Sequence, residues 1–174
     1  MEPITDRETH RLADLLERAV RGGAWHGPAL AESLIGVDAA TAAAHPVPDG
    51  HSIWEIVLHA AAWSDIARRR MAGEAADRVP EEEDWPPVGP PPEGTSEEAW
   101  QAARKTLDEA HRRLHADLLA LPEDCLENCV AGSDPTIRGL LLGLLQHHTY
   151  HAGQIVILKK GVAGAGEAAA VGVR

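Results

Sequence analysis

Apolar residues recur at helical spacing along four long segments, and this pattern strongly limits what the chain can fold into. In one segment the repeat is seven residues long, at Trp100, Leu107, Leu114 and Leu121. Seven residues make about two turns of an α-helix, so these side chains lie along one helical face. The same reasoning predicts long helices near residues 5–21, 52–72, 96–121 and 136–160. No stretch is typical of a strand.

Four amphipathic helices bury their apolar faces most simply against one another, so we expect an all-α four-helix bundle. A short extra helix is predicted from Ala29 to about Ile35. Between the second and third long helices, residues 79–94 are rich in proline, and successive prolines cannot continue a helix. This stretch is therefore predicted to be a long extended crossover, anchored to the body of the protein by Trp85.

Polar residues at three helix starts match the pattern of an N-terminal cap. Ser52 with Glu55, and Thr5 with Glu8, have the three-residue spacing of a capping box. Ser96 is expected to cap the third long helix. These positions predict where the helices begin.

The length of 174 residues suits one domain, predicted over residues 1–160, followed by a Gly/Ala-rich C-terminal tail at 161–174. The first eleven residues lack the apolar core of a signal peptide, and no apolar run reaches the length of a membrane span. Cys125 and Cys129 are expected to be reduced thiols. A cytoplasmic protein is the simplest interpretation.

The net charge is −11, from 16 basic and 27 acidic side chains with neutral histidines. This charge argues against binding to nucleic-acid phosphates or to an anionic membrane, and leaves a small molecule as the expected substrate. The densest basic run is Arg68 to Arg70. Three consecutive residues spread around a helix, so we expect this run to be solvated.

His147 and His151 stand four residues apart inside an apolar run from Leu140 to Leu158, so both project from one helical face. Two unpartnered imidazoles in apolar surroundings would be costly. His59, in the helix predicted at 52–72, is a candidate third partner. Three histidines around one metal ion leave coordination positions open, which is typical of catalytic rather than structural sites.

Other interpretations of the histidines stay open at this point. His147, His151 and His59 are also compatible with hydrogen-bonded core residues. His111 and His115 repeat the four-residue spacing among charged neighbours, where a solvated face is the better account. His148, about 100° away from His147 around the helix, is expected to support the site from behind or to lie in an interface.

Three polar side chains near the histidines are candidates for supporting roles. Gln154 follows His151 by three residues and is expected to orient a ligand or to cap a buried polar group. Glu55 and Asp65 flank His59 in sequence. Either could act as a base or as the hydrogen-bond partner of a ligand, and the alternative is that both are solvated carboxylates on the helix surface.

Two segments together resemble the DinB/YfiT-like superfamily of metalloenzymes, the damage-inducible bundle family rather than the polymerase that shares its name. They are Ser-Ile-Trp-Glu-Ile-Val-Leu-His at residues 52–59 and His-His-Thr-Tyr-His-Ala-Gly-Gln-Ile at 147–155. The similarity includes residues 24–30 and the Trp85-Pro86 crossover, and covers nearly the whole chain.

The resemblance implies a bundle of up-down-down-up order, commonly dimeric. It also implies a divalent metal, often nickel or zinc, held by residues that match His59, His147 and His151. Characterised relatives include transferases and isomerases that use low-molecular-weight thiols such as bacillithiol or mycothiol. Ala152 stands where the family often has arginine, so an anion contact from that position is not expected here.

Neutral imidazoles leave a bound metal its full charge, which acidifies a water or holds a thiol as thiolate. The leading expectation is therefore a metal-dependent enzyme, either a thiol S-transferase or a hydrolase. The alternatives are a metal-binding module without catalysis and a metal-free helical dimer. A homodimer is also expected because the apolar positions around Trp54 and along the third long helix exceed the needs of one bundle seam.

Overall fold

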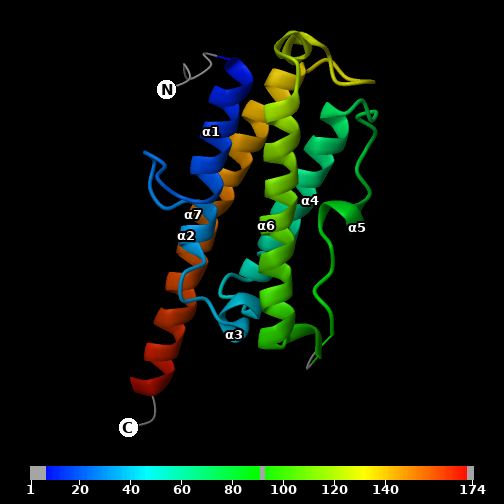
Figure 1. Ribbon diagram of the computed structural model, residues 1–174. Helices are drawn as coiled ribbons and strands as arrows, with labels where there is room; N and C mark the ends of the chain where they lie inside the picture. Colours follow the sequence, from blue (N-terminus) through cyan, green and yellow to red (C-terminus); the bar gives the residue numbers. More distant parts are fainter. Residues whose placement is uncertain (1–6, 91–92, 172–174) are drawn as a thin grey trace.

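The computed structural model describes the backbone of residues 7–90 and 93–171 and the side chains of residues 7–90 and 94–164. Four long helices pack together (Figure 1): α1 Glu8–Val20, α4 Ile53–Met71, α6 Glu97–Ala120 and α7 Ile137–Val171. The shorter elements are α2 Leu30–Ser33, α3 Ala39–Ala43, α5 Glu81–Asp84, η1 Glu93–Thr95 and η2 Glu123–Glu127. Within the described ranges there is no strand beyond one isolated bridge, so the all-α prediction is confirmed.

The helix starts follow the predicted caps. Ser52 Oγ accepts a hydrogen bond from the Glu55 amide at 3.2 Å, while Glu55 Oε2 accepts one from the Ser52 amide at 2.7 Å. Ser96 Oγ accepts from the Ala99 amide at 3.1 Å. Each bond satisfies an amide that has no partner within its own helix, which is why α4 and α6 begin where they do. Thr5, the other predicted cap, lies outside the described residues.

The core consists of two apolar clusters stacked along the bundle. One joins α2, α3 and the first half of α4 to α6, and includes Ala152 of α7. The other joins α1 to the second half of α4, and includes Leu144 of α7. Residues 147–151 therefore lie at the boundary between the two clusters, where buried polar groups need specific partners.

The last helix is longer than predicted. The sequence suggests an end by Gly161, but α7 continues to Val171, and that predicted boundary is wrong. Residues 162–171 contain five alanines and no proline. Alanine has the highest helix propensity, so the five alanines favour the helix here although each glycine is roughly 1 kcal/mol less favourable than alanine. None of the helices in the part of the chain described is long and apolar enough to cross a membrane.

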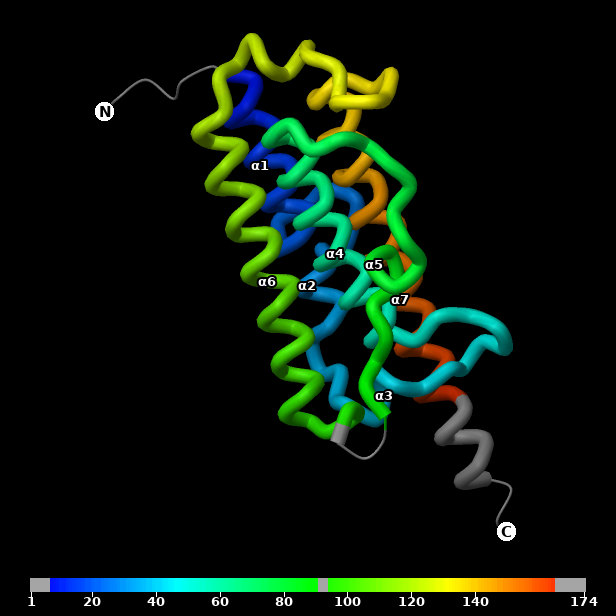
Figure 2. Tube along the Cα trace, turned by 90° about the vertical axis from the view of Figure 1, so that its right-hand side faces the viewer, coloured from blue at the N-terminus to red at the C-terminus, as the bar shows by residue number. Residues whose placement is uncertain are grey.

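The proline-rich connection between α4 and α6 is not extended throughout, because it contains α5 and η1. Pro80 immediately precedes α5, and all four residues of this short helix are acidic. Proline at a helix start and acidic residues in the first turn are both favourable there. Figure 2 shows the connection passing along the outside of α4, with α5 beside the middle of the bundle.

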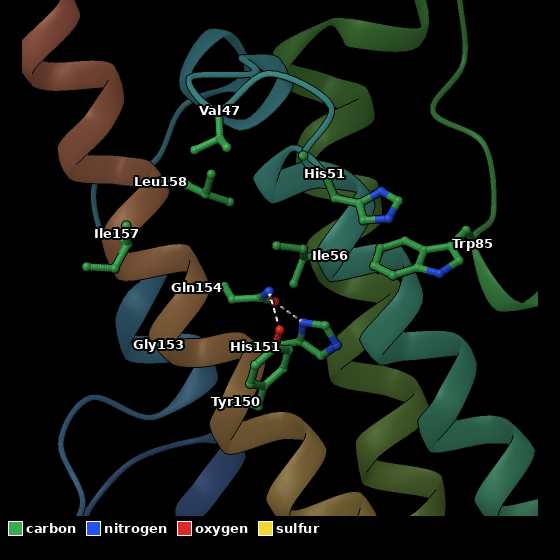
Figure 3. A pocket seen from close by; sticks show the side chains of 11 residues that line it. Val47, His51, Ile56, Trp85, Tyr150, His151, Gly153, Gln154, Ile157 and Leu158 are labelled. Carbon is green, nitrogen blue, oxygen red and sulfur yellow. Dashed lines mark hydrogen bonds between the residues drawn. The ribbon is translucent and has the colours of Figure 1, made fainter.

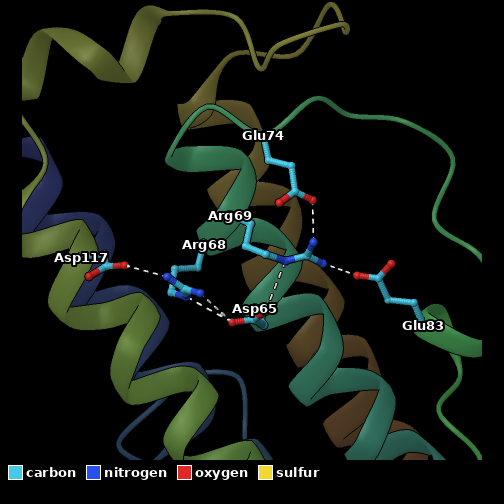
Figure 4. A network of polar contacts seen from close by, with 6 residues as sticks. All are labelled: Asp65, Arg68, Arg69, Glu74, Glu83 and Asp117. Carbon is cyan, nitrogen blue, oxygen red and sulfur yellow. Dashed lines mark hydrogen bonds and ion pairs between the residues drawn. The ribbon is translucent and has the colours of Figure 1, made fainter.

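The basic run is part of an ion-pair network rather than solvated, contrary to the prediction (Figure 4). Arg68 pairs with Asp65 at 3.1 Å and with Asp117 of α6 at 3.4 Å. Arg69 pairs with Glu83 of α5. Both arginine side chains are about one-third exposed or less. The Arg69–Glu83 pair ties α5 to α4, which places the residues after Glu83 against the bundle.

Candidate metal centre

Two helices bring the three predicted ligands together. His59 comes from the middle of α4, and His147 and His151 from consecutive turns of α7. His147 Nε2 lies 2.8 Å from His59 Nε2 and 3.0 Å from His151 Nε2. The possible ligand atoms of the three residues all lie within 4.8 Å of one another. His59 and His151 are buried and His147 is half-buried, so the cluster is largely shielded from solvent.

The outer ring nitrogens of two of these histidines have carbonyl acceptors. His59 Nδ1 donates to the backbone carbonyl of Asp84 at 2.6 Å. His151 Nδ1 donates to Gln154 Oε1, also at 2.6 Å (Figure 3). A carbonyl oxygen can only accept, so the hydrogen of each neutral ring is on Nδ1. Each Nε2 therefore presents a lone pair to the centre of the cluster.

These tautomers leave the cluster short of one hydrogen. Both lone pairs, on His59 and His151, face Nε2 of His147. A hydrogen on that nitrogen can satisfy only one of them, and the other lone pair then faces a nitrogen that has no second hydrogen to donate. A cation at the centre would satisfy all three nitrogens at once. The donor set suits a divalent transition metal, for which imidazole is a favoured ligand.

The electrostatics keep the three rings neutral at pH 7. Burial lowers the pKa of His147 to about 4, and repulsion from the other two histidines acts in the same direction. Burial also lowers the pKa of His151 to about 4. The pKa of His59 is lowered by burial as well, with Asp84 opposing the shift. Neutral imidazole is the form that binds a metal.

Two residues of the connection, Asp84 and Trp85, complete the surroundings of His59, and sequence reasoning missed the first. Asp84 Oδ1 accepts a hydrogen bond from Trp63 Nε1 at 2.7 Å and lies 3.1 Å from His59 Nδ1. The Trp85 ring stacks on His59 at 3.8 Å and on His51 at 3.5 Å. Trp85 thus anchors the crossover as predicted. The acidic helix start after Pro80 was the available signal for Asp84.

The carboxylates proposed from sequence have other partners. Glu55 caps α4 and lies 3.1 Å from His45 Nε2. Asp65 pairs with Arg68. Asp84 and Gln154, rather than these carboxylates, accept the hydrogen bonds from the Nδ1 atoms of His59 and His151. The bond to His151 agrees with the orienting role expected of Gln154.

Two further histidines, His148 and His111, lie in the core. His148 is fully buried, and its ring centroid is 5.7 Å from that of His147, but its Nε2 lies 3.1 Å from Ser64 Oγ of α4. His111 is 1% exposed and bonds to Glu17 Oε2 of α1 at 2.9 Å, so the predicted solvated face is wrong for this residue. His111 lies four residues after Leu107 and three before Leu114, which places it on the buried stripe of α6.

Cavities lie on two sides of the histidine cluster. One of about 650 Å³ includes His151 in its wall, between α4 and α7 (Figure 3). Another of about 380 Å³ includes His59 and His147. Within the described part of the chain, the two walls share no residue. A metal held by the three histidines can therefore be approached from two directions.

An all-α bundle with this three-histidine cluster defines the class of protein, and the sequence comparison gives its family. Residues 24–155 match the family profile of the DinB superfamily, which is well over half of the chain. The chain therefore belongs to the DinB superfamily. No curated protein and no solved structure shows significant similarity to it. The match spans His59, His147 and His151, the whole candidate site.

Proposed function

We propose that this protein is a metal-dependent enzyme in which His59, His147 and His151 hold one divalent transition metal, nickel or zinc. The reaction is a thiol S-transfer or a hydrolysis. The observation that carries the proposal is the pair of lone pairs, from His59 and His151, aimed at a nitrogen that can offer only one hydrogen. Free thiols at Cys125 and Cys129 agree with a cytoplasmic location.

When bound, the metal supplies Lewis acidity that gives a nucleophile from water or a thiol at neutral pH. Residues of the chain orient the ligands and limit the access of water. The Asp84 carbonyl and Gln154 fix the tautomer and ring orientation of two ligands. Trp85 covers one face of His59 and limits the access of water from that side.

The structure weighs against the two alternatives. In a metal-free core, the lone pair of either His59 Nε2 or His151 Nε2 would lack a hydrogen-bond donor in a buried position, which is costly. A metal-binding module without catalysis needs no space for a substrate, whereas cavities of about 650 and 380 Å³ adjoin the cluster. An enzyme accounts for both observations.

The proposal keeps the predicted up-down-down-up order of the long helices. The course of the chain in Figure 1 supports it, because α4 and α6 run in one direction while α1 and α7 run in the other. With this order, α4 and α7 are neighbours although a long stretch of chain separates them. His59 can then meet the α7 pair.

We also propose that the protein is a homodimer, although not for the reason that the sequence suggests. Trp54 is 2% exposed and the α6 stripe is buried within the chain, so these positions offer no free surface. Trp25, by contrast, is fully exposed, and Leu15 is 44% exposed beside it at a cavity between α1 and α7. Sedimentation of the wild type and of Trp25→Ser tests the proposal, with dissociation expected in the variant.

The central experiment measures metal and activity together. Metal-free protein is titrated with Zn²⁺ or Ni²⁺ by calorimetry, and one ion per chain is expected. The loaded protein is then assayed with a thiol plus 1-chloro-2,4-dinitrobenzene, and separately with a nitrophenyl ester. Metal-dependent turnover of either pair identifies the reaction. Binding without turnover of any substrate would favour the metal-binding module, and failure to bind an ion would overturn the proposal.

A further inference from the structure

We infer that the larger cavity binds an uncharged, mainly apolar substrate that carries a hydrogen-bond acceptor, and that the hydroxyl of Tyr150 selects this acceptor. The inference rests on the proposed function for its catalytic meaning, since His151 forms part of the cavity wall. It names the substrate class of that same site.

The first argument is the chemistry of the cavity wall. Its aliphatic side chains come from the loop before α4, from α4 and from α7: Val47, Ile56, Ile157 and Leu158. Among the described lining residues there is no Asp, Glu, Lys or Arg. A charged ligand would lose its hydration there without gaining a partner. The chain's net charge of −11 disfavours an anion further.

The second argument is a hydrogen-bond relay that ends at the cavity (Figure 3). His151 Nδ1 donates to Gln154 Oε1, and Gln154 Nε2 donates to the Tyr150 hydroxyl at 3.0 Å. Tyr150 acts as the acceptor in this contact, so its own hydrogen remains for a ligand. The ring is 62% exposed and forms part of the cavity wall. A carbonyl, nitro or ether oxygen fits this donor.

The third argument is the contrast with the smaller cavity. There Asp84, His59 and His147 are in the wall, among apolar residues such as Trp63 and Leu140. None of the described residues that line either cavity is a lysine or arginine. The cavity beside His151 has the larger volume of the two, about 650 Å³ against about 380 Å³, and no carboxylate in its described wall, so we assign the large apolar part of the substrate to it. An electrophile with a neutral acceptor group is compatible with the uncharged wall, can accept a hydrogen bond from Tyr150 and can lie next to His151.

A matched set of probes tests the inference: 2-acetylnaphthalene, 2-naphthoate and naphthalene, which differ in charge and in acceptor. Calorimetry is performed on the full chain with and without Zn²⁺. We expect the ketone to bind at least about tenfold more tightly than the carboxylate. Tyr150→Phe should weaken the ketone by about twofold to tenfold, towards naphthalene, since one hydrogen bond is lost. Equal binding of ketone and carboxylate would overturn the inference.

Two glycines of α7 provide matched steric variants. An added Cβ meets nothing within 4 Å at Gly153, in the wall of the larger cavity, or at Gly143, in the wall of the smaller one. Leucine is also a better helix former than glycine, so both variants should fold. Gly153→Leu should reduce ketone binding more than tenfold, while Gly143→Leu should leave it unchanged. The opposite pattern would place the ligand in the smaller cavity and contradict the inference.

A charge reversal completes the test. Ile157 is 63% exposed, so Ile157→Lys is tolerated and puts a cation at the cavity wall. We expect this variant to bind 2-naphthoate more tightly than the ketone. Zn²⁺ titration of the same proteins separates the two proposals. A variant that no longer binds the probe but binds zinc normally has a changed cavity and an intact metal centre. A wild type that prefers the ketone but binds no metal would refute only the proposed metal centre.

Discussion

The same four-residue histidine spacing occurs twice in this bundle, in α6 and in α7, with different results. In α7, His147 and His151 turn their Nε2 atoms to each other and to His59. In α6, the rings of His111 and His115 are 6.2 Å apart, and His111 bonds to Glu17 of α1. In α6, His111 joins two helices, whereas the pair in α7 belongs to a group of three histidines that could hold a metal ion.

The difference lies in the partners rather than in the spacing. The α7 pair faces a third imidazole from α4, and Gln154 holds the outer nitrogen of His151. In the α6 pair, His111 faces the Glu17 carboxylate, which accepts the hydrogen that this ring offers. Spacing places two rings on one helical face, and the groups opposite decide whether these rings donate a hydrogen or present lone pairs.

Removal of a ligand should have the largest effect on this contrast. In His151→Ala the cluster keeps two of its three imidazoles, and we expect zinc affinity to fall by more than about a hundredfold, since even outer hydrogen-bond partners are worth about 10–100-fold. His115→Ala is the matched control with the same substitution in α6. Calorimetric titration of both variants gives the comparison. Equal zinc affinities in the two variants would refute the assignment.

Substitution of Gln154 should have the next largest effect. Gln154→Leu keeps the side-chain size but removes the acceptor of His151 Nδ1, so the ring is free to change tautomer or to turn. We expect zinc affinity to fall by about 10–100-fold. Tyr150→Phe removes the far end of the relay and should leave zinc affinity nearly unchanged. A Gln154→Leu protein with wild-type affinity would show that the bond does not orient the ligand.

Acid should destabilise the metal-free protein through the α7 pair. The pKa values of His147 and His151 are about 4 in the fold, against 6.5 in the unfolded chain. Between these values the unfolded state binds more protons, so the free energy of unfolding falls as pH decreases from 6.5 and levels off below about 4. Urea unfolding at several pH values measures this decline.

A pair of variants links the acid effect to the comparison of the two helices. The double variant His147→Leu/His151→Leu should flatten the decline more than His111→Leu, because it removes two buried titrating groups instead of one. Burial lowers the pKa of His111 in the same direction. Identical pH profiles for wild type and the double variant would contradict this account.

The smallest effects are expected in α6 itself. His111→Ala removes a buried hydrogen bond to Glu17 and should cost about 1–3 kcal/mol of stability, without a change in zinc affinity. His115→Ala, at a half-buried position, should change stability by about 0.5 kcal/mol or less. Urea unfolding measures both. Loss of zinc binding in either variant would remove the distinction between the two pairs.

Features that depend on neighbours in the sequence could be predicted. The apolar stripes of α4 and α6 and the caps at Ser52 and Ser96 follow from spacing along one helix, and the structure agrees within a residue or so at their ends. The three clustered histidines were identified from one helical pair and one distant partner. For these features, local geometry and the apolar pattern agree.

Features that depend on the connection between helices could not be predicted. Asp84 reaches His59 from 25 residues away, and its position depends on the Arg69–Glu83 pair and on the Trp63 bond. No periodicity marks such contacts. The solvated interpretation of His111 failed because charged neighbours in the sequence lie on other faces of α6, while its own face turns towards α1.

The two hydrogen bonds that hold the outer nitrogens of His59 and His151 differ in how they respond to sequence change during evolution. The first ends on the backbone carbonyl of residue 84, which every amino acid possesses, so it persists through drift at that position while the course of α5 is kept. The second ends on the side chain of Gln154 and disappears or changes with one substitution. A lineage can therefore retune the basicity of one ligand through position 154 while His59 keeps its orientation.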